Sequence, residues 1–73
     1  MKLHGSITAN LEDAIASSRR LRSRPVYPDT IRHWNEIIRE ARHLRTDLPE
    51  DGRRKLDALI GDLERELIER GRS

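Results

Sequence analysis

Apolar residues recur at intervals of three and four along most of the chain, and this spacing predicts helices. Three stretches show the pattern, so we expect helices over residues of about 10–23, 29–45 and 50–69. Their apolar stripes are Leu11, Ala14, Ile15, Ser18 and Leu21, then Ile31, Trp34, Ile37, Ile38, Ala41 and Leu44, and finally Leu56, Leu59, Ile60, Leu63, Leu67 and Ile68. Because it lies on the second stripe, Trp34 is interpreted as a core residue.

The breaks between the predicted helices are marked by proline and glycine. Pro25 and Pro28 disfavour helix in the residues before them, so they bracket the first connection. The sequence TDLPEDG at residues 46–52 predicts a turn, and Gly71 is a favourable place for the last helix to stop. If the chain reverses at residues 47–50, the second and third stripes face each other in one register, as expected for an antiparallel helical hairpin. The predicted fold is therefore all-α, a small three-helix bundle built on this hairpin.

The first eight residues follow a different pattern. Leu3, Gly5 and Ile7 alternate with polar residues, which favours a short extended or flexible tail over residues 1–8. Thr8 or Asn10 would then cap the first helix. We expect one helical domain over residues 9–70 and a flexible C-terminus over residues 71–73.

Composition narrows the classes of function. The chain has 73 residues and no cysteine, and its three histidines lie ten or more residues apart, so we expect no thiol chemistry and no metal site. The serines have no nucleophile-elbow glycines and the four glycines are scattered, so neither a catalytic triad nor a phosphate loop is expected. The sequence predicts a protein that is not an enzyme and needs no cofactor or small-molecule substrate. Without an apolar run of membrane-spanning length, we expect it in the cytoplasm.

Charge is distributed unevenly along the chain. Residues 1–45 carry nine basic and five acidic groups, whereas residues 46–73 carry six and eight. The N-terminal half is therefore expected to contact a negatively charged partner. The candidate binding residues are Arg19, Arg20, Arg22, Arg24 and Tyr27, with Arg32, Arg39 and His43 on the outer face of the second helix. A structural alternative is that arginines at the end of the first helix only interact favourably with its dipole.

Three kinds of binding function remain open. A basic patch fits an acidic protein surface or phosphates. Sequence-specific DNA binding is less favoured because Glu36 and Glu40 share the outer face with the basic residues, and only two aromatic residues are present for stacking on single strands. A small basic nucleic-acid-binding regulator is the alternative to a protein-binding one, and a self-associating helical protein is the third.

One short segment resembles a known protein. Residues 28–34, PDTIRHW, are similar to the pattern P-[D/E]-x-I-R-x-W near the N-terminus of the β′ subunit of bacterial RNA polymerase. The matching positions are Pro28, Asp29, Ile31, Arg32 and Trp34, and the residues after Trp34 depart from the polymerase pattern. The whole chain, in its length and arginine-rich composition, resembles small phage-encoded transcription regulators of the Xanthomonas-phage antiterminator type.

That resemblance implies a partner and a mode of action. It implies binding to host RNA polymerase near the β′ N-terminus and the RNA exit channel, with inhibition of initiation and read-through of terminators. The location implied is the host cytoplasm, and contact with nascent RNA or DNA is a possible addition. A basic N-terminal half agrees with either an acidic protein surface or emerging RNA.

Overall fold

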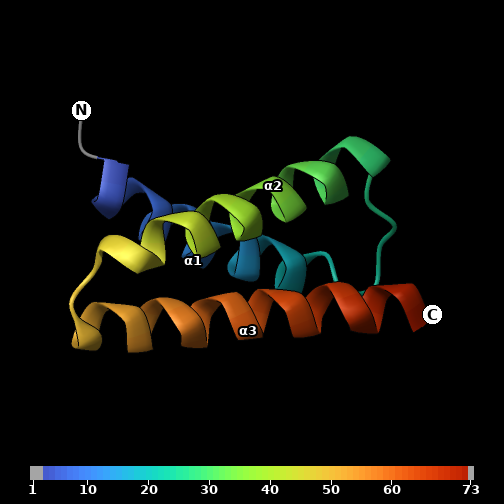
Figure 1. The fold of residues 1–73 in the computed structure, drawn as a ribbon. Helices are drawn as coiled ribbons and strands as arrows, with labels where there is room; N and C mark the ends of the chain where they lie inside the picture. The colour runs from blue at the N-terminus through green and yellow to red at the C-terminus, as the bar shows by residue number, and fades with distance from the viewer. Residues whose placement is uncertain (1–2, 73) are drawn as a thin grey trace.

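The fold consists of three helices joined by short connections (Figure 1). A computed structural model of the chain describes residues 3–72, with side chains for residues 7–71. The helices are α1 (Leu3–Arg20), α2 (Pro28–Leu44) and α3 (Glu50–Arg72), and a 3-10 turn, η1 (Arg45–Asp47), follows α2. Each helix contacts the other two, as in a three-helix bundle, and no strand occurs in residues 3–72. The predicted all-α fold class is confirmed.

Helix α3 sets the length of the molecule. Its 23 residues span about 34 Å at 1.5 Å per residue, close to the longest extent of 37 Å. Helices α1 and α2 both pack along it. The core consists of apolar side chains from all three helices: Ile7, Leu11, Ala14, Ile15, Trp34, Ile37, Ile38, Ala41, Leu56, Ile60 and Leu63. Trp34 is 4% exposed, so its interpretation as a core residue is confirmed.

The start of α2 follows from its local sequence. Tyr27 occupies the N-cap position with an extended backbone, and Pro28 takes the first turn, where its missing N–H costs no intrahelical hydrogen bond. Asp29 places a negative charge near the positive end of the helix dipole. Before this point the chain leaves α1 through turns in which the Arg24 N–H donates to the Leu21 carbonyl oxygen at 2.9 Å.

The expectation of an extended N-terminal tail is wrong for residues 3–8, which are helical. Ile7 lies one helical turn before Leu11, and both side chains are buried, at 3% and 0% exposed. Residues four apart lie on the same face of a helix, so Ile7 joins Leu11 on the side of α1 that faces the core. Thr8 and Asn10 accordingly lie inside α1 and do not cap it. Met1 and Lys2, also assigned to the tail, lie outside the described residues.

Three smaller expectations also need correction. Helix α1 ends at Arg20, three residues earlier than expected, because residues 21–24 form turns before Pro25. Helix α3 continues through Gly71 to Arg72, so Gly71 does not stop it, and Ser73 lies outside the described residues. Ile68, assigned to the core stripe, is 59% exposed.

Candidate functional site

Four arginines and a tyrosine cluster where α1 ends and the connection to α2 begins. We call Arg19, Arg20, Arg22, Arg24 and Tyr27 the arginine corner. The first two lie in the last turn of α1, and the others lie in the connection up to the N-cap of α2. The C-terminal part of α3 runs past the same region (Figure 1). The structure therefore brings these predicted residues together and adds groups from α3.

A buried carboxylate on α3 holds two of the arginines. Glu66 accepts a hydrogen bond from the Ser18 hydroxyl at 2.9 Å, although both residues lie inside the protein. The same carboxylate forms ion pairs with Arg22 at 2.9 Å and with Arg19 at 3.3 Å. The side chain of Glu66 is 9% exposed, whereas those of Arg19 and Arg22 are more than half exposed. These two arginines therefore compensate the buried charge of Glu66 and connect the end of α1 and the residues just after it to α3.

Arg70, one turn after Glu66, completes the connection to α1. Its guanidinium donates to the Ser18 hydroxyl at 3.1 Å, to the Ser18 carbonyl at 2.7 Å and to the Arg24 carbonyl at 3.2 Å. The two carbonyls lie at and beyond the end of α1, where helix carbonyls lack intrahelical donors. Arg70 also lies over the Trp34 ring, 5.6 Å from its centroid, in a cation–π contact. One side chain thus connects all three helices.

The ionisation of Glu66 reflects these neighbours. Burial alone would raise the pKa of the Glu66 carboxyl group, and this is the largest single effect on it. The hydrogen bonds from Ser18 and Arg19, together with the charges of Arg22 and Arg19, outweigh burial and hold the pKa of Glu66 below its ordinary value of 4.5. Glu66 is therefore a carboxylate at neutral pH.

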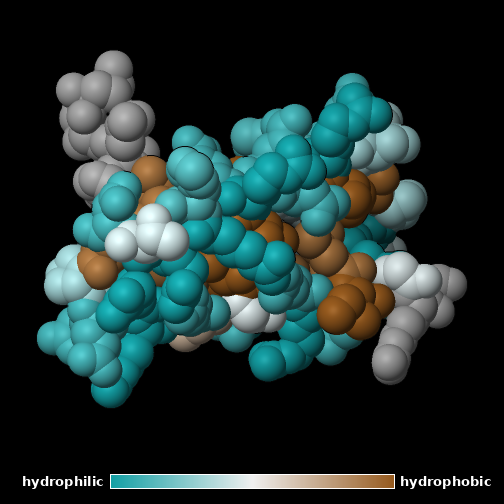
Figure 2. Space-filling view, viewed as in Figure 1, coloured by the Kyte–Doolittle hydropathy of each residue, from teal (hydrophilic) through white to brown (hydrophobic). Residues whose placement is uncertain are grey.

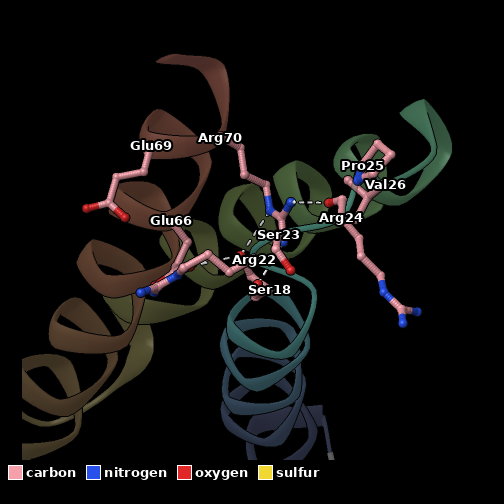
Figure 3. A pocket seen from close by; sticks show the side chains of 9 residues that line it. All are labelled: Ser18, Arg22, Ser23, Arg24, Pro25, Val26, Glu66, Glu69 and Arg70. Atoms are coloured by element: carbon pink, nitrogen blue, oxygen red, sulfur yellow. Dashed lines mark hydrogen bonds and ion pairs between the residues drawn. The ribbon is translucent and has the colours of Figure 1, made fainter. Parts of the chain in front are cut away.

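A hollow of about 580 Å³ opens beside this network (Figure 3). It is lined by Ser18, Arg22, Ser23, Arg24, Pro25, Val26, Glu66, Glu69 and Arg70. Both hydroxyl functions of Ser18 are engaged, since it donates to Glu66 and accepts from Arg70. No histidine lines the hollow to act as a base on that hydroxyl. The guanidinium groups of Arg22 and Arg70 on its lining are of the kind that form charge-assisted hydrogen bonds with anionic groups.

The rest of the arginine corner faces solvent. Tyr27 is 81% exposed, an unusual position for a large aromatic side chain. Arg20 is exposed and bonds only its neighbour Ser17 among the described residues, at 3.2 Å. The Arg24 side chain points away from Glu66 and Arg70 in Figure 3 and forms no ion pair within residues 7–71. Arg20, Arg24 and Tyr27 are thus accessible to a partner.

The remaining predicted residues lie apart from the corner, along the exposed side of α2. Arg32 forms an exposed ion pair with Asp29 at 3.3 Å. Arg39 and His43 are exposed, two and three turns further along the helix. Of the eight predicted site residues, five therefore share one corner and three share one face of α2.

Sequence reasoning missed Glu66 and Arg70. A signal was present, because both residues continue the apolar stripe of α3 at the spacing of Leu59 and Leu63. Charged residues at core positions need hydrogen-bond or ion-pair partners, and Ser18, a polar residue on the apolar stripe of α1, was a candidate partner. Ser18 and Glu66 are 48 residues apart, so the pattern alone did not connect them.

Within the described part of the chain, no group of three or more His, Cys, Asp or Glu residues is placed to hold a metal ion. No helix there is long and apolar enough to cross a membrane. Comparison with known protein families, with characterised proteins and with solved structures finds no match for this chain.

Proposed function

We propose that this chain is a transcription regulator without catalytic activity that binds bacterial RNA polymerase through the arginine corner. It acts in the cytoplasm of the bacterial host, near the N-terminus of the β′ subunit and the RNA exit channel. There it inhibits initiation and promotes read-through of terminators. The observation that carries the binding role is Tyr27, which is 81% exposed three residues after the exposed Arg24 in the connection to α2.

The chemistry of the corner supports a protein partner. Tyrosine and arginine are the residue types that contribute most to binding energy at protein interfaces. An aromatic ring left in water at the edge of a charged surface gains most when a partner buries it. The neighbouring guanidiniums of Arg20 and Arg24 can form charge-assisted hydrogen bonds with carboxylates on that partner. An acidic protein surface fits this combination.

The similarity of residues 28–34 to the β′ subunit supports the choice of polymerase. In the structure these residues form the first turns of α2, where Trp34 is buried and Ile31 is half-buried. Pro28 and Asp29 directly follow Tyr27 in the chain and are exposed, and Arg32 is exposed about one turn further along α2, where it pairs with Asp29. The exposed part of the similar segment thus adjoins the arginine corner, so one partner could contact both.

An antiparallel hairpin of α2 and α3 is the scaffold that this proposal assumes. Two ion pairs support it, because they link the end of α2 and η1 to α3. Arg45 binds Asp57 through two hydrogen bonds of 2.7 and 2.8 Å, and Arg42 binds Glu64, two turns further along α3. The arginine that lies earlier in the chain, Arg42, pairs with the residue that lies later on α3, Glu64. This reversed order is characteristic of antiparallel packing.

The test measures binding to polymerase by charge reversal at positions that do not support the fold. Arg22 is unsuitable, because a carboxylate there would face the buried Glu66. The double variant Arg20→Glu/Arg24→Glu and the single variant Tyr27→Ala avoid Glu66 and Arg70. Binding of each to immobilised RNA polymerase from a Xanthomonas host is measured by biolayer interferometry. We expect each to weaken binding by roughly tenfold or more.

The matched control reverses two charges elsewhere. Arg54 and Lys55 are exposed on α3, and Arg54 pairs only with Glu50 on its own helix among the described residues. Arg54→Glu/Lys55→Glu has the same net charge change and should bind like the wild type. If both double variants weakened polymerase binding equally, the loss would be explained by the change in net charge and not by the arginine corner. Strong binding of the wild type to bare RNA or DNA, falling steeply with salt, would replace this proposal with a nucleic-acid-binding function.

A further inference from the structure

A second accessible surface lies between α2 and α3. A groove of about 560 Å³ runs between these helices, and apolar surface is visible between their polar side chains in Figure 2. It is lined by Asn35, Ile38, Arg39, Arg42, Glu64, Leu67 and Ile68. None of these residues belongs to the arginine corner. The groove is therefore a separate candidate surface.

The apolar part of the groove is incompletely covered. Ile38 is buried beneath it, and Leu67 is half-buried against the core. Ile68 is 59% exposed, and besides Tyr27 it is the one large hydrophobic side chain that faces solvent among the described residues. Removing Ile68 and the edge of Leu67 from water would favour binding of any apolar group that fits the groove.

The charges of the groove determine what kind of partner fits. Glu64 is already paired with Arg42 across the two helices. Arg39 forms no ion pair within the described residues, and Asn35 donates its amide to the Ile31 carbonyl at 3.1 Å. Glu36 lies beside Arg39 in an adjoining hollow and does not line the groove. The lining therefore offers one accessible cation next to exposed apolar surface, which calls for an apolar partner that carries a carboxylate.

The size of the apolar surface argues against a second copy of the chain. A stable interface between two proteins buries roughly 800 Å² on each side. Here one exposed isoleucine and a half-buried leucine provide the apolar contact, which is far less. A single helix lying in the groove needs only a few anchors at positions i, i+3 or i+4, and i+7.

We propose that the groove between α2 and α3 binds an acidic amphipathic helix of a partner protein. Apolar side chains of that helix contact Ile38, Leu67 and Ile68, and a carboxylate of the helix pairs with Arg39. The inference concerns a surface distinct from the arginine corner and does not depend on the polymerase being the partner.

The test selects binders without assuming a sequence. A phage-displayed library of helix-forming peptides, randomised at its surface positions, is panned against the full chain and counter-selected only on the uncoated support. The expected result is enrichment of peptides with net negative charge and apolar residues at helical spacing. The best peptide, synthesised with a fluorescent label, should bind the wild type in an anisotropy titration.

Variants then locate the binding. Ile68→Asp and Arg39→Glu should each weaken peptide binding by roughly tenfold or more. Lys55→Glu, an exposed charge reversal outside the groove, should leave binding unchanged, and so should Arg20→Glu/Arg24→Glu. Because Ile68 and Arg39 are exposed, both variants should retain the helical circular dichroism of the wild type. A variant that lost its helicity would be replaced by Ile68→Ser or Arg39→Gln at the same position.

Other outcomes would overturn the inference. Enriched peptides that are basic or lack apolar periodicity would do so, as would binding that Ile68→Asp leaves intact. A concentration-dependent dimer in sedimentation, dissociated by Ile68→Asp, would make the groove an interface between copies. A wild-type chain that binds the peptide but does not bind polymerase would support this surface alone, whereas polymerase binding without peptide binding would support the arginine corner alone, so the two proposals can fail separately.

Discussion

Replacing Glu66 by alanine should lower the free energy of unfolding severely while leaving the three-helix fold of the native state unchanged. The substitution removes the acceptor of the Ser18 hydroxyl, which is 0% exposed, and leaves that donor without the carboxylate. A hydrogen bond to a charged group contributes about 1.5–3 kcal/mol. The ion pairs with Arg19 and Arg22 are partly exposed and add about 0.2–1 kcal/mol each. We expect a total loss of about 2–5 kcal/mol.

That loss is large relative to the whole stability. A chain of this length has an unfolding free energy of roughly 4–11 kcal/mol at the usual value per residue. Urea titration at pH 7 measures the loss, with Trp34 fluorescence and circular dichroism as two probes. Trp34 is the only tryptophan and is buried, so its emission reports loss of the core. The midpoint should fall with little change in the slope of unfolding free energy against urea.

The control is a carboxylate on the same helix and beside the same hollow. Glu69 is exposed, so Glu69→Ala should change the unfolding free energy by less than about 0.5 kcal/mol. If Glu66→Ala were as mild as Glu69→Ala, the network around Ser18 would contribute nothing to the fold. The reasoning from its buried contacts would then be refuted.

The pH dependence gives a second readout of the same group. Because the pKa of Glu66 is lower in the folded protein than its ordinary value of 4.5, the unfolded chain binds more protons in the acid range. The stabilising contribution is complete above pH 4.5 and is lost as the pH falls through the folded pKa. The stability difference between the wild type and Glu66→Gln should therefore shrink below pH 4.5. A difference that stays constant down to pH 3 would contradict the lowered pKa.

Three further substitutions test the packing. Leu63→Ala removes a side chain that is 0% exposed and should cost about 2–5 kcal/mol, measured as a shift in the urea midpoint. Gly61→Ala should raise the free energy of unfolding by roughly 0.5–1 kcal/mol, because a Cβ added there, in the middle of α3, meets nothing within 4 Å and alanine favours helix over glycine. A lower melting temperature for this variant would contradict the prediction that the added methyl group fits without a clash. Arg45→Gln should lower the melting temperature far less than Leu63→Ala, since its bond to Asp57 is exposed to water.

The sequence was sufficient to predict α2 and α3 but not the start of α1. Six apolar residues at helical spacing, with Pro28 in the first turn, leave few alternatives for α2. At the N-terminus, Leu3, Gly5 and Ile7 fit a period of two over a stretch too short to distinguish it from a helix. The deciding contact is tertiary, because Ile7 is buried with Leu11 in a core that α2 and α3 complete.

The site was predictable as a concentration of charge but not as a set of contacts. Four arginines within six residues identify the corner, and Tyr27 adds an exposed aromatic ring. Periodicity gives no information on which arginine meets a carboxylate from a distant helix. Glu66 engages Arg19 and Arg22, whereas Arg20 binds Ser17 on its own helix and the Arg24 side chain points away from Glu66 in Figure 3. Arg19 and Arg22 thus have a role in packing α3, which differs from the interaction with the helix dipole considered from the sequence.

The accessible residues fall on two surfaces whose contributions to binding can be separated. Tyr27 and Arg39 are twelve residues apart along α2, which is about 18 Å of helix. Substitutions more than 7–10 Å apart without shared partners change binding free energy additively, within about 0.5 kcal/mol. If one polymerase surface contacts both the corner and the groove, Tyr27→Ala and Arg39→Glu should each weaken polymerase binding, and the double variant should show the sum of the two losses. A double variant no weaker than Tyr27→Ala alone would mean that Arg39 serves a different partner.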